Sequence, residues 1–167
     1  MPAASSLKIK AALKIQRTVP EVFDAIVDPE KMSNYFISKG SGRMEDGKTI
    51  IWRFPEFDME FPIEVLKVIR DESIKYSWSD PEENTTIVEM ILKPVGNNET
   101  FVTITEGNRE NDEAGILWLQ RNTEGWANFL ACLKAYLEYG INLRKGAFDI
   151  SQMAEKESQE NAISNKV

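Results

Sequence analysis

The feature that most constrains the fold is a change of hydrophobic period near residue 113. Between residues 7 and 105, apolar and polar residues alternate in several short segments, as they do in half-buried strands. Over residues 114–139 the apolar side chains instead recur every three or four positions, which predicts one long helix that Gly140 closes as a C-cap. Several strands in succession followed by a helix indicate an antiparallel sheet and an α+β fold.

The segments between turn signals predict six or seven strands and two short helices. The expected strands cover residues 7–19, 49–54, 59–65, 74–78, 86–92 and 101–105, and the segment 106–113 is assigned to a polar connection. After the first strand, Thr18 and Glu21 have capping-box spacing around Pro20, which predicts a short helix. Asp28 and Pro29 begin a second short helix that is expected to run to about residue 36.

Length and charge indicate one domain and limit its partners. The chain has 167 residues, of which 42% are hydrophobic and 28% charged, so we expect a single domain over residues 1–148 and a polar, frayed or disordered tail over 149–167. A formal charge of −7 disfavours nucleic acid and anionic membrane surfaces as partners. No apolar run has the length of a signal peptide or a membrane-spanning helix, so the expected location is cytoplasmic.

The residue types exclude several kinds of chemistry. The sequence has no histidine, which removes imidazole bases and triads, and a single cysteine, Cys132, which leaves no ligand set for zinc or iron–sulfur sites. We therefore expect no catalytic residue, no metal and no cofactor. Arg121, at the edge of the apolar stripe of the long helix, either reaches a buried acid or extends into solvent.

One motif matches a phosphate-binding loop in letters only. Residues 42–49 read G-x-x-x-x-G-K-T, but a phosphate loop needs a helix directly after it, and here the strand-forming segment 50–54 follows. Glu45 and Asp46 also place two negative charges within the loop. We therefore expect that no nucleotide binds here.

A large set of aromatic and leucine residues is the candidate ligand site. These residues either fill the space between sheet and long helix as ordinary core, or leave an apolar cavity whose polar tips orient a ligand, and periodicity does not decide between the two. Tyr35 and Phe36 are the candidate gate of such a cavity. The full candidate set is Tyr35, Phe36, Trp52, Phe54, Phe61, Tyr76, Trp78, Trp118, Trp126, Phe129, Leu130 and Leu133.

The order of elements resembles the helix-grip arrangement of the START-like superfamily. Within it, segments 19–25, 28–30, 61–65, 74–78 and 125–133 resemble the family related to the C-terminal domain of the activator of heat-shock protein 90 ATPase, although Tyr35-Phe36 stands where Trp-Phe is usual. The resemblance implies a curved sheet wrapped around the long helix with a cavity between them.

Three functions remain open at this stage. The first is non-catalytic binding of a small hydrophobic or aromatic ligand in that cavity, which the absence of histidine and the aromatic interior favour. The second is a protein-interaction module, with a chaperone or another protein as partner, as the family resemblance implies. The third is a cavity enzyme of the polyketide cyclase type, as the superfamily resemblance implies.

Overall fold

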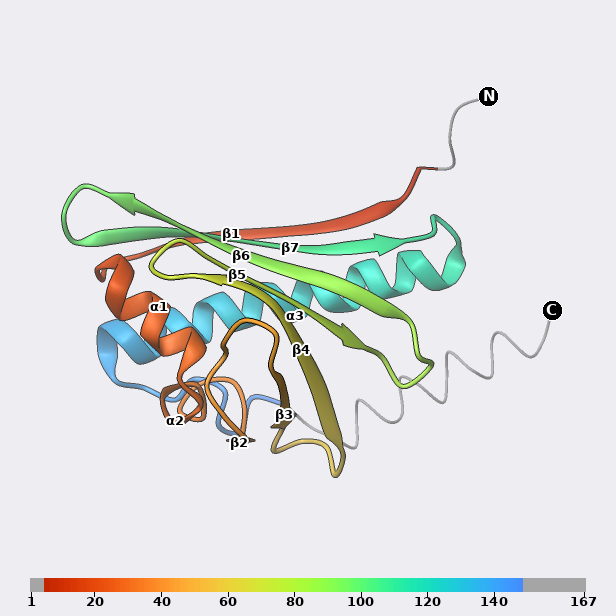
Figure 1. Cartoon of the computed structure of the whole chain (residues 1–167), viewed down its shortest axis with the longest axis horizontal. Coiled ribbons are helices and arrows are strands. Elements are labelled where there is room, and N and C mark those ends of the chain that lie inside the picture. The colour runs from red at the N-terminus through yellow and green to blue at the C-terminus, as the bar shows by residue number, and fades with distance from the viewer. Residues whose placement is uncertain (1–4, 149–167) are drawn as a thin grey trace.

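Seven antiparallel strands form one curved sheet that lies against a long C-terminal helix (Figure 1). The computed structural model describes residues 5–148, so the tail predicted for residues 149–167 lies outside the described residues. The strands are β1 (Leu7–Ile15), β2 (Lys39–Gly40), β3 (Thr49–Arg53), β4 (Glu60–Ile69), β5 (Ser73–Ser79), β6 (Thr85–Val95) and β7 (Glu99–Arg109). The helices are α1 (Val19–Val27), α2 (Pro29–Met32) and α3 (Glu113–Tyr139).

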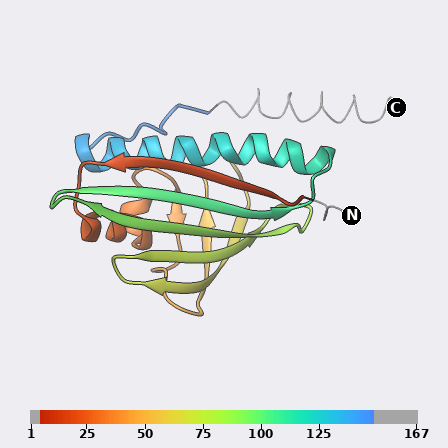
Figure 2. The same cartoon turned by 90° about the horizontal axis from the view of Figure 1, so that it is seen from above.

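The strand order confirms the helix-grip arrangement. The sheet runs β1-β7-β6-β5-β4-β3-β2, so each strand from β2 to β7 pairs with its neighbour in sequence, and β1 pairs with β7. The view in Figure 2 shows β1 alongside β7, with α3 running beside them. Helices α1 and α2 lie at the end of the molecule where α3 finishes (Figure 1). This arrangement leaves the concave face of the sheet covered mainly by one helix.

Local signals explain where the helices begin and end. The backbone N–H of Thr18 donates to Glu21 Oε2 at 3.0 Å, as the capping-box spacing predicts for α1. Asp112 accepts a hydrogen bond from the Gly115 N–H at 2.7 Å and so caps the start of α3. Gly140 ends α3 with a φ of 66°, a left-handed conformation that glycine adopts without steric cost.

Several predicted boundaries were wrong. Strand β1 ends at Ile15 and not at residue 19, because Thr18 caps α1 and Val19 begins it. Strand β4 continues to Ile69, beyond the predicted end at residue 65, because it stays paired with β5.

Helix α2 ends at Met32 and not near residue 36, because the chain continues in tight turns in which the N–H groups of Phe36 and Ile37 both donate to the Met32 carbonyl. Strand β7 continues to Arg109, so the first part of the supposed polar connection 106–113 belongs to the sheet. The strand pairing extends this far because Glu106 still pairs with Val88 of β6.

The loop that resembles a phosphate-binding motif leads into a strand. Strand β3 begins at Thr49, and the Lys48 ammonium forms an ion pair with Glu45 in the same loop. A strand, β3, therefore stands where a true phosphate loop needs the helix that holds the phosphates. This confirms the structural context expected from the sequence.

In residues 5–148, no helix is long and apolar enough to cross a membrane. The longest, α3, has a mixed surface that is buried only along the stripe facing the sheet.

Candidate ligand-binding site

A pocket opens at the end of the molecule where α2 lies and α3 finishes (Figure 1). Its volume is about 390 Å³. The walls come from three segments that are distant in sequence: the turns after α2, the loop after β3 and the segment that follows α3. The lining residues are Ser33, Tyr35, Phe36, Ile37, Ser38, Pro55, Glu56, Asn142, Arg144, Lys145, Gly146 and Phe148.

Of the candidate residues, Tyr35 and Phe36 line this pocket. The others lie behind its floor, in one cluster between sheet and helix. Fully or nearly buried there are Trp52, Phe54, Tyr76, Trp118, Trp126, Phe129, Leu130 and Leu133. Phe61 and Trp78 are partly buried and pack against the same cluster. The sequence-based set therefore comprises two pocket residues and the core behind them.

Aromatic rings connect the pocket floor with the interior. The Phe36 ring lies 4.7 Å from that of Phe129 and 5.7 Å from that of Trp52, both edge to face. Trp52 in turn meets Tyr76 at 5.5 Å, and Trp126 meets Phe36 at 6.2 Å. Such edge-to-face pairs are favourable beyond the area they bury. The floor of the pocket is thus one end of a continuous ring cluster.

Arg144, which sequence reasoning missed, forms one wall of the pocket. Its guanidinium donates to both carboxylate oxygens of Glu56, at 3.0 and 2.8 Å, and both side chains are largely buried. The same guanidinium lies 5.5 Å from the ring centres of Phe36 and Phe54 and 4.7 Å from that of Phe148. This arrangement ties the segment after α3 to the loop after β3 by a two-point ion pair, and to the pocket floor by a cation–π contact with Phe36.

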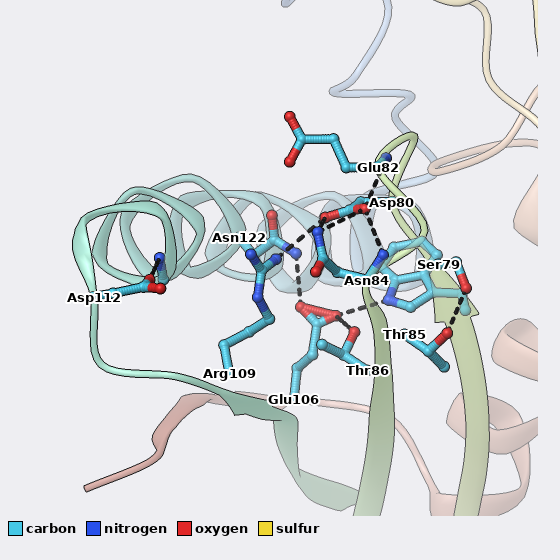
Figure 3. Close-up of polar contacts among 12 residues, drawn as sticks. Ser79, Asp80, Glu82, Asn84, Thr85, Thr86, Glu106, Arg109, Asp112 and Asn122 are labelled. Carbon is cyan, nitrogen blue, oxygen red and sulfur yellow. Dashed lines mark hydrogen bonds and ion pairs between the residues drawn. The ribbon is translucent and has the colours of Figure 1, made fainter. Parts of the chain in front are cut away.

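A buried carboxylate, also missed from the sequence, lies deeper between helix and sheet (Figure 3). Glu106 of β7 is fully buried and accepts hydrogen bonds from β5, β6 and α3. The donors are Trp78 Nε1 at 2.7 Å, Thr86 Oγ1 at 3.2 Å, Asn122 Nδ2 at 2.7 Å and Trp126 Nε1 at 3.4 Å. A buried carboxylate needs such partners, since an unpaired one would be strongly destabilising.

Two sequence signals together could have identified this cluster. Glu106 continues the alternation of the inward residues Val102 and Ile104, and Asn122 lies one helical turn from both Trp118 and Trp126 on the buried stripe. A polar residue at a core position in each of two facing elements predicts a buried hydrogen bond. Arg121, a candidate partner of a buried acid from its place on the helix, is exposed, and its neighbour Asn122 donates to Glu106.

The far end of the cluster is closed by a second ion pair. Arg109 Nη1 lies 3.1 Å from Asp80 Oδ2, and its guanidinium lies 5.7 Å from the ring centre of Trp118 (Figure 3). Asp80 Oδ1 also accepts hydrogen bonds from the backbone N–H groups of Glu82 and Asn84, which fixes the β5–β6 loop. Trp118 is therefore covered at the end of α3 that lies away from the pocket.

The Cys132 thiol and the Tyr35 hydroxyl lie inside the core. Burial raises the pKa of the Cys132 thiol, which makes the thiolate scarce at neutral pH. Burial likewise raises the pKa of Tyr35 well above its ordinary value, and its hydroxyl donates to the Ala25 carbonyl at 2.8 Å. Across the described residues, no group of three or more acidic or cysteine side chains is placed to hold a metal ion.

A comparison with protein-family profiles shows which family this fold belongs to. Residues 16–138 match the family described as activator of Hsp90 ATPase homolog 1-like protein. The chain belongs to this family. No curated protein sequence matches significantly.

Solved structures of similar proteins agree with this assignment. The protein SSP2350 from Staphylococcus saprophyticus is 30% identical, with a TM-score of 0.72 over 82% of this chain and 96% of the other. The Aha1 dimer from Colwellia psychrerythraea is 25% identical, with a TM-score of 0.68 over 80% of this chain and 98% of the other. CalU16 from Micromonospora echinospora shares the fold, with 19% identity and a TM-score of 0.67 over 92% of this chain and 86% of the other.

Proposed function

We propose that the protein is a non-catalytic binder of a small, largely hydrophobic molecule, which it holds in the pocket between the turns after α2 and the segment after α3. The observation that carries this proposal is the pocket itself. Its volume of about 390 Å³ is suited to a ligand of two or three fused rings, and Phe36 and Tyr35 give it an aromatic floor. The ring cluster behind the floor supplies further apolar surface if a ligand displaces Phe36.

The ion pair of Arg144 and Glu56 in the pocket wall also favours ligand binding. The Arg144 guanidinium already lies against Phe36 and Phe54, so a flat apolar molecule on the same floor would meet a cation over its face. Because Glu56 neutralises this cation, the pair adds little net charge to the pocket. The proposed ligand therefore gains apolar and cation–π contact without having to carry a charge.

The test uses N-phenyl-1-naphthylamine, a neutral apolar probe whose emission rises when it leaves water. We expect saturable binding to the unmodified protein. Ser38→Trp places an indole in the pocket, because Ser38 lines it, and should weaken binding by about tenfold or more, which corresponds to about 1.4 kcal/mol. Lys39→Trp is the matched control, since it puts the same side chain on the next residue of the chain, which is exposed and does not line the pocket.

Two results would contradict the proposal. One is the absence of saturable binding by this probe and by a panel of fused-ring compounds, judged also by the melting temperature, which any molecule that binds only the folded state must raise. The other is equal affinity in Ser38→Trp and Lys39→Trp, which would place the bound probe elsewhere on the protein.

The two alternatives rest on relationship alone. An interaction module, with a chaperone or another protein as partner, is supported by membership of the activator family, and a cavity enzyme by superfamily resemblance. Within residues 5–148, no particular contact favours either over ligand binding. A rise in melting temperature with a protein partner, together with none from the ring compounds, would favour the interaction module.

A further inference from the structure

The hydroxyl of Tyr76 on β5 is a buried polar group without a hydrogen-bond partner among the described residues. Its side chain is fully buried, between the rings of Trp52 at 5.5 Å and Trp78 at 5.9 Å. Leaving a buried hydroxyl unpaired is destabilising, so proteins seldom keep one without a purpose. Phenylalanine would fill nearly the same volume without this cost.

The Glu106 carboxylate, whose charge acts on Tyr76, is already engaged by other groups. Trp78 packs against the Tyr76 ring and donates its own indole N–H to Glu106, and Thr86, Asn122 and Trp126 supply the other hydrogen bonds to that carboxylate. Burial raises the pKa of Tyr76 well above its ordinary value of 10, and the charge of Glu106 adds to this rise. The phenol therefore stays protonated and can donate.

Two successive ring contacts connect the pocket lining with Tyr76. Phe36 lines the pocket and meets Trp52 at 5.7 Å, and Trp52 meets Tyr76. Tyr35, which also lines the pocket, is close enough to Tyr76 to influence its ionisation. A molecule that displaces the Phe36 ring would thus approach the unpaired hydroxyl from the pocket side.

We propose that the Tyr76 hydroxyl is the polar subsite of the ligand site, and that the preferred ligand is a neutral aromatic molecule carrying one hydroxyl or carbonyl oxygen. This inference rests on the proposed function. A ligand oxygen would pair with a hydroxyl that has no bond to lose, so the gain is not offset by a broken contact. The buried Glu106 carboxylate repels an anion in this low-dielectric interior, and therefore the ligand is neutral.

The experiment compares three naphthalenes substituted at the same position by displacement of N-phenyl-1-naphthylamine: 2-naphthol, 2-methylnaphthalene, which is close to it in shape, and 2-naphthoate. Each is measured on the unmodified protein, on Tyr76→Phe and on Tyr139→Phe, the last being a control at an exposed tyrosine. We expect the preference for 2-naphthol over 2-methylnaphthalene to fall by about 2- to 10-fold in Tyr76→Phe, the range for one neutral hydrogen bond. Tyr139→Phe should leave this preference unchanged, and 2-naphthoate should bind more weakly than 2-naphthol to the unmodified protein.

The outcomes separate this inference from the proposed function. If the neutral ligands displace the probe but Tyr76→Phe keeps the full preference for 2-naphthol, the subsite is wrong and the pocket stands. Equal binding of 2-naphthoate and 2-naphthol would overturn the assignment of a neutral ligand. If neither the probe nor any naphthalene binds, both proposals fail. Tyr76→Phe should fold normally because it removes only an unpaired oxygen, and its melting temperature checks this.

Discussion

The indole nitrogen of Trp126 on α3 lies 3.4 Å from Oε1 of Glu106 on β7, so helix and sheet are joined by a polar contact within an otherwise apolar layer. The ring of the same tryptophan lies 6.2 Å from that of Phe36, which lines the pocket. One side chain therefore links the pocket floor with the buried carboxylate. A change at Glu106 should be felt both in stability and at the pocket.

Glu106→Gln should lower the free energy of unfolding by about 2–3 kcal/mol, because in either orientation the amide N–H₂ that replaces one oxygen faces an indole N–H, of Trp78 or Trp126, which can only donate. Urea denaturation measures the change. Glu64→Gln, an exposed site on β4, is the control and should stay within about 0.5 kcal/mol of the unmodified protein. Equal effects at the two positions would mean that the buried network contributes nothing to stability.

Two glycines of α3 should respond in opposite directions to alanine. A Cβ at Gly115 would lie 1.9 Å from the Glu110 carbonyl oxygen, so Gly115→Ala must shift the backbone and should cost about 1–3 kcal/mol. A Cβ at Gly125 meets nothing within 4 Å, so Gly125→Ala should stabilise the helix by about 0.5–1 kcal/mol. Thermal unfolding of both variants tests this, and a loss of stability at Gly125 would show that its helix face is not open.

The capping box at the start of α1 should give the protein a defined acid sensitivity. Hydrogen bonds from the Thr18 hydroxyl and backbone N–H lower the pKa of Glu21 from its ordinary value of 4.5. The ionised Glu21 side chain therefore stabilises the folded protein fully above about pH 4.5. This stabilisation is lost as the pH falls through the lowered pKa of Glu21. Denaturation of the unmodified protein and of Glu21→Gln between neutral and acidic pH should show a difference that shrinks with acidification. A difference that stays constant would contradict this assignment.

The loop around Lys48 should bind no nucleotide. Lys48→Ala removes one exposed ion pair with Glu45, so its stability should stay within about 0.5 kcal/mol of the unmodified protein. Calorimetric titration with ATP or GTP should give no heat of binding for either protein. Micromolar affinity that disappears with Lys48 would prove the loop functional.

The sequence predicted the architecture well because periodicity records which side chains face the core. Alternation located the strands other than the two-residue β2, and the 3.6-residue period located α3 to within one residue of its start. The capping signals at Thr18 and Asp28 placed the two short helices. Boundaries failed where tertiary contacts decide them, as in β7, whose last residues are held by pairing with β6 and β1.

The pocket was harder to predict from the sequence than the fold. Periodicity shows which side chains face the interior, but it does not show how completely they fill it. Trp52 and Phe129 face the interior as expected, yet neither borders the pocket. The wall formed by Arg144 and Glu56 comes from two connecting segments with no regular period, and nothing in the sequence brings them together. Tyr76 was correctly placed inside, but only three-dimensional contacts show that its hydroxyl lacks a partner among the described residues.

The pairing of β1 with β7 has a consequence for how the chain acquires its structure during synthesis. Leu7 pairs with Arg109 and Ile15 with Thr100, and α3 then packs against β1. On a ribosome the first strand must therefore wait for most of the sheet to emerge before it finds its neighbour, and the apolar side of the strand stays exposed in the meantime. The strands from β2 to β7 can pair in order as they appear, so the step that seals the sheet comes last.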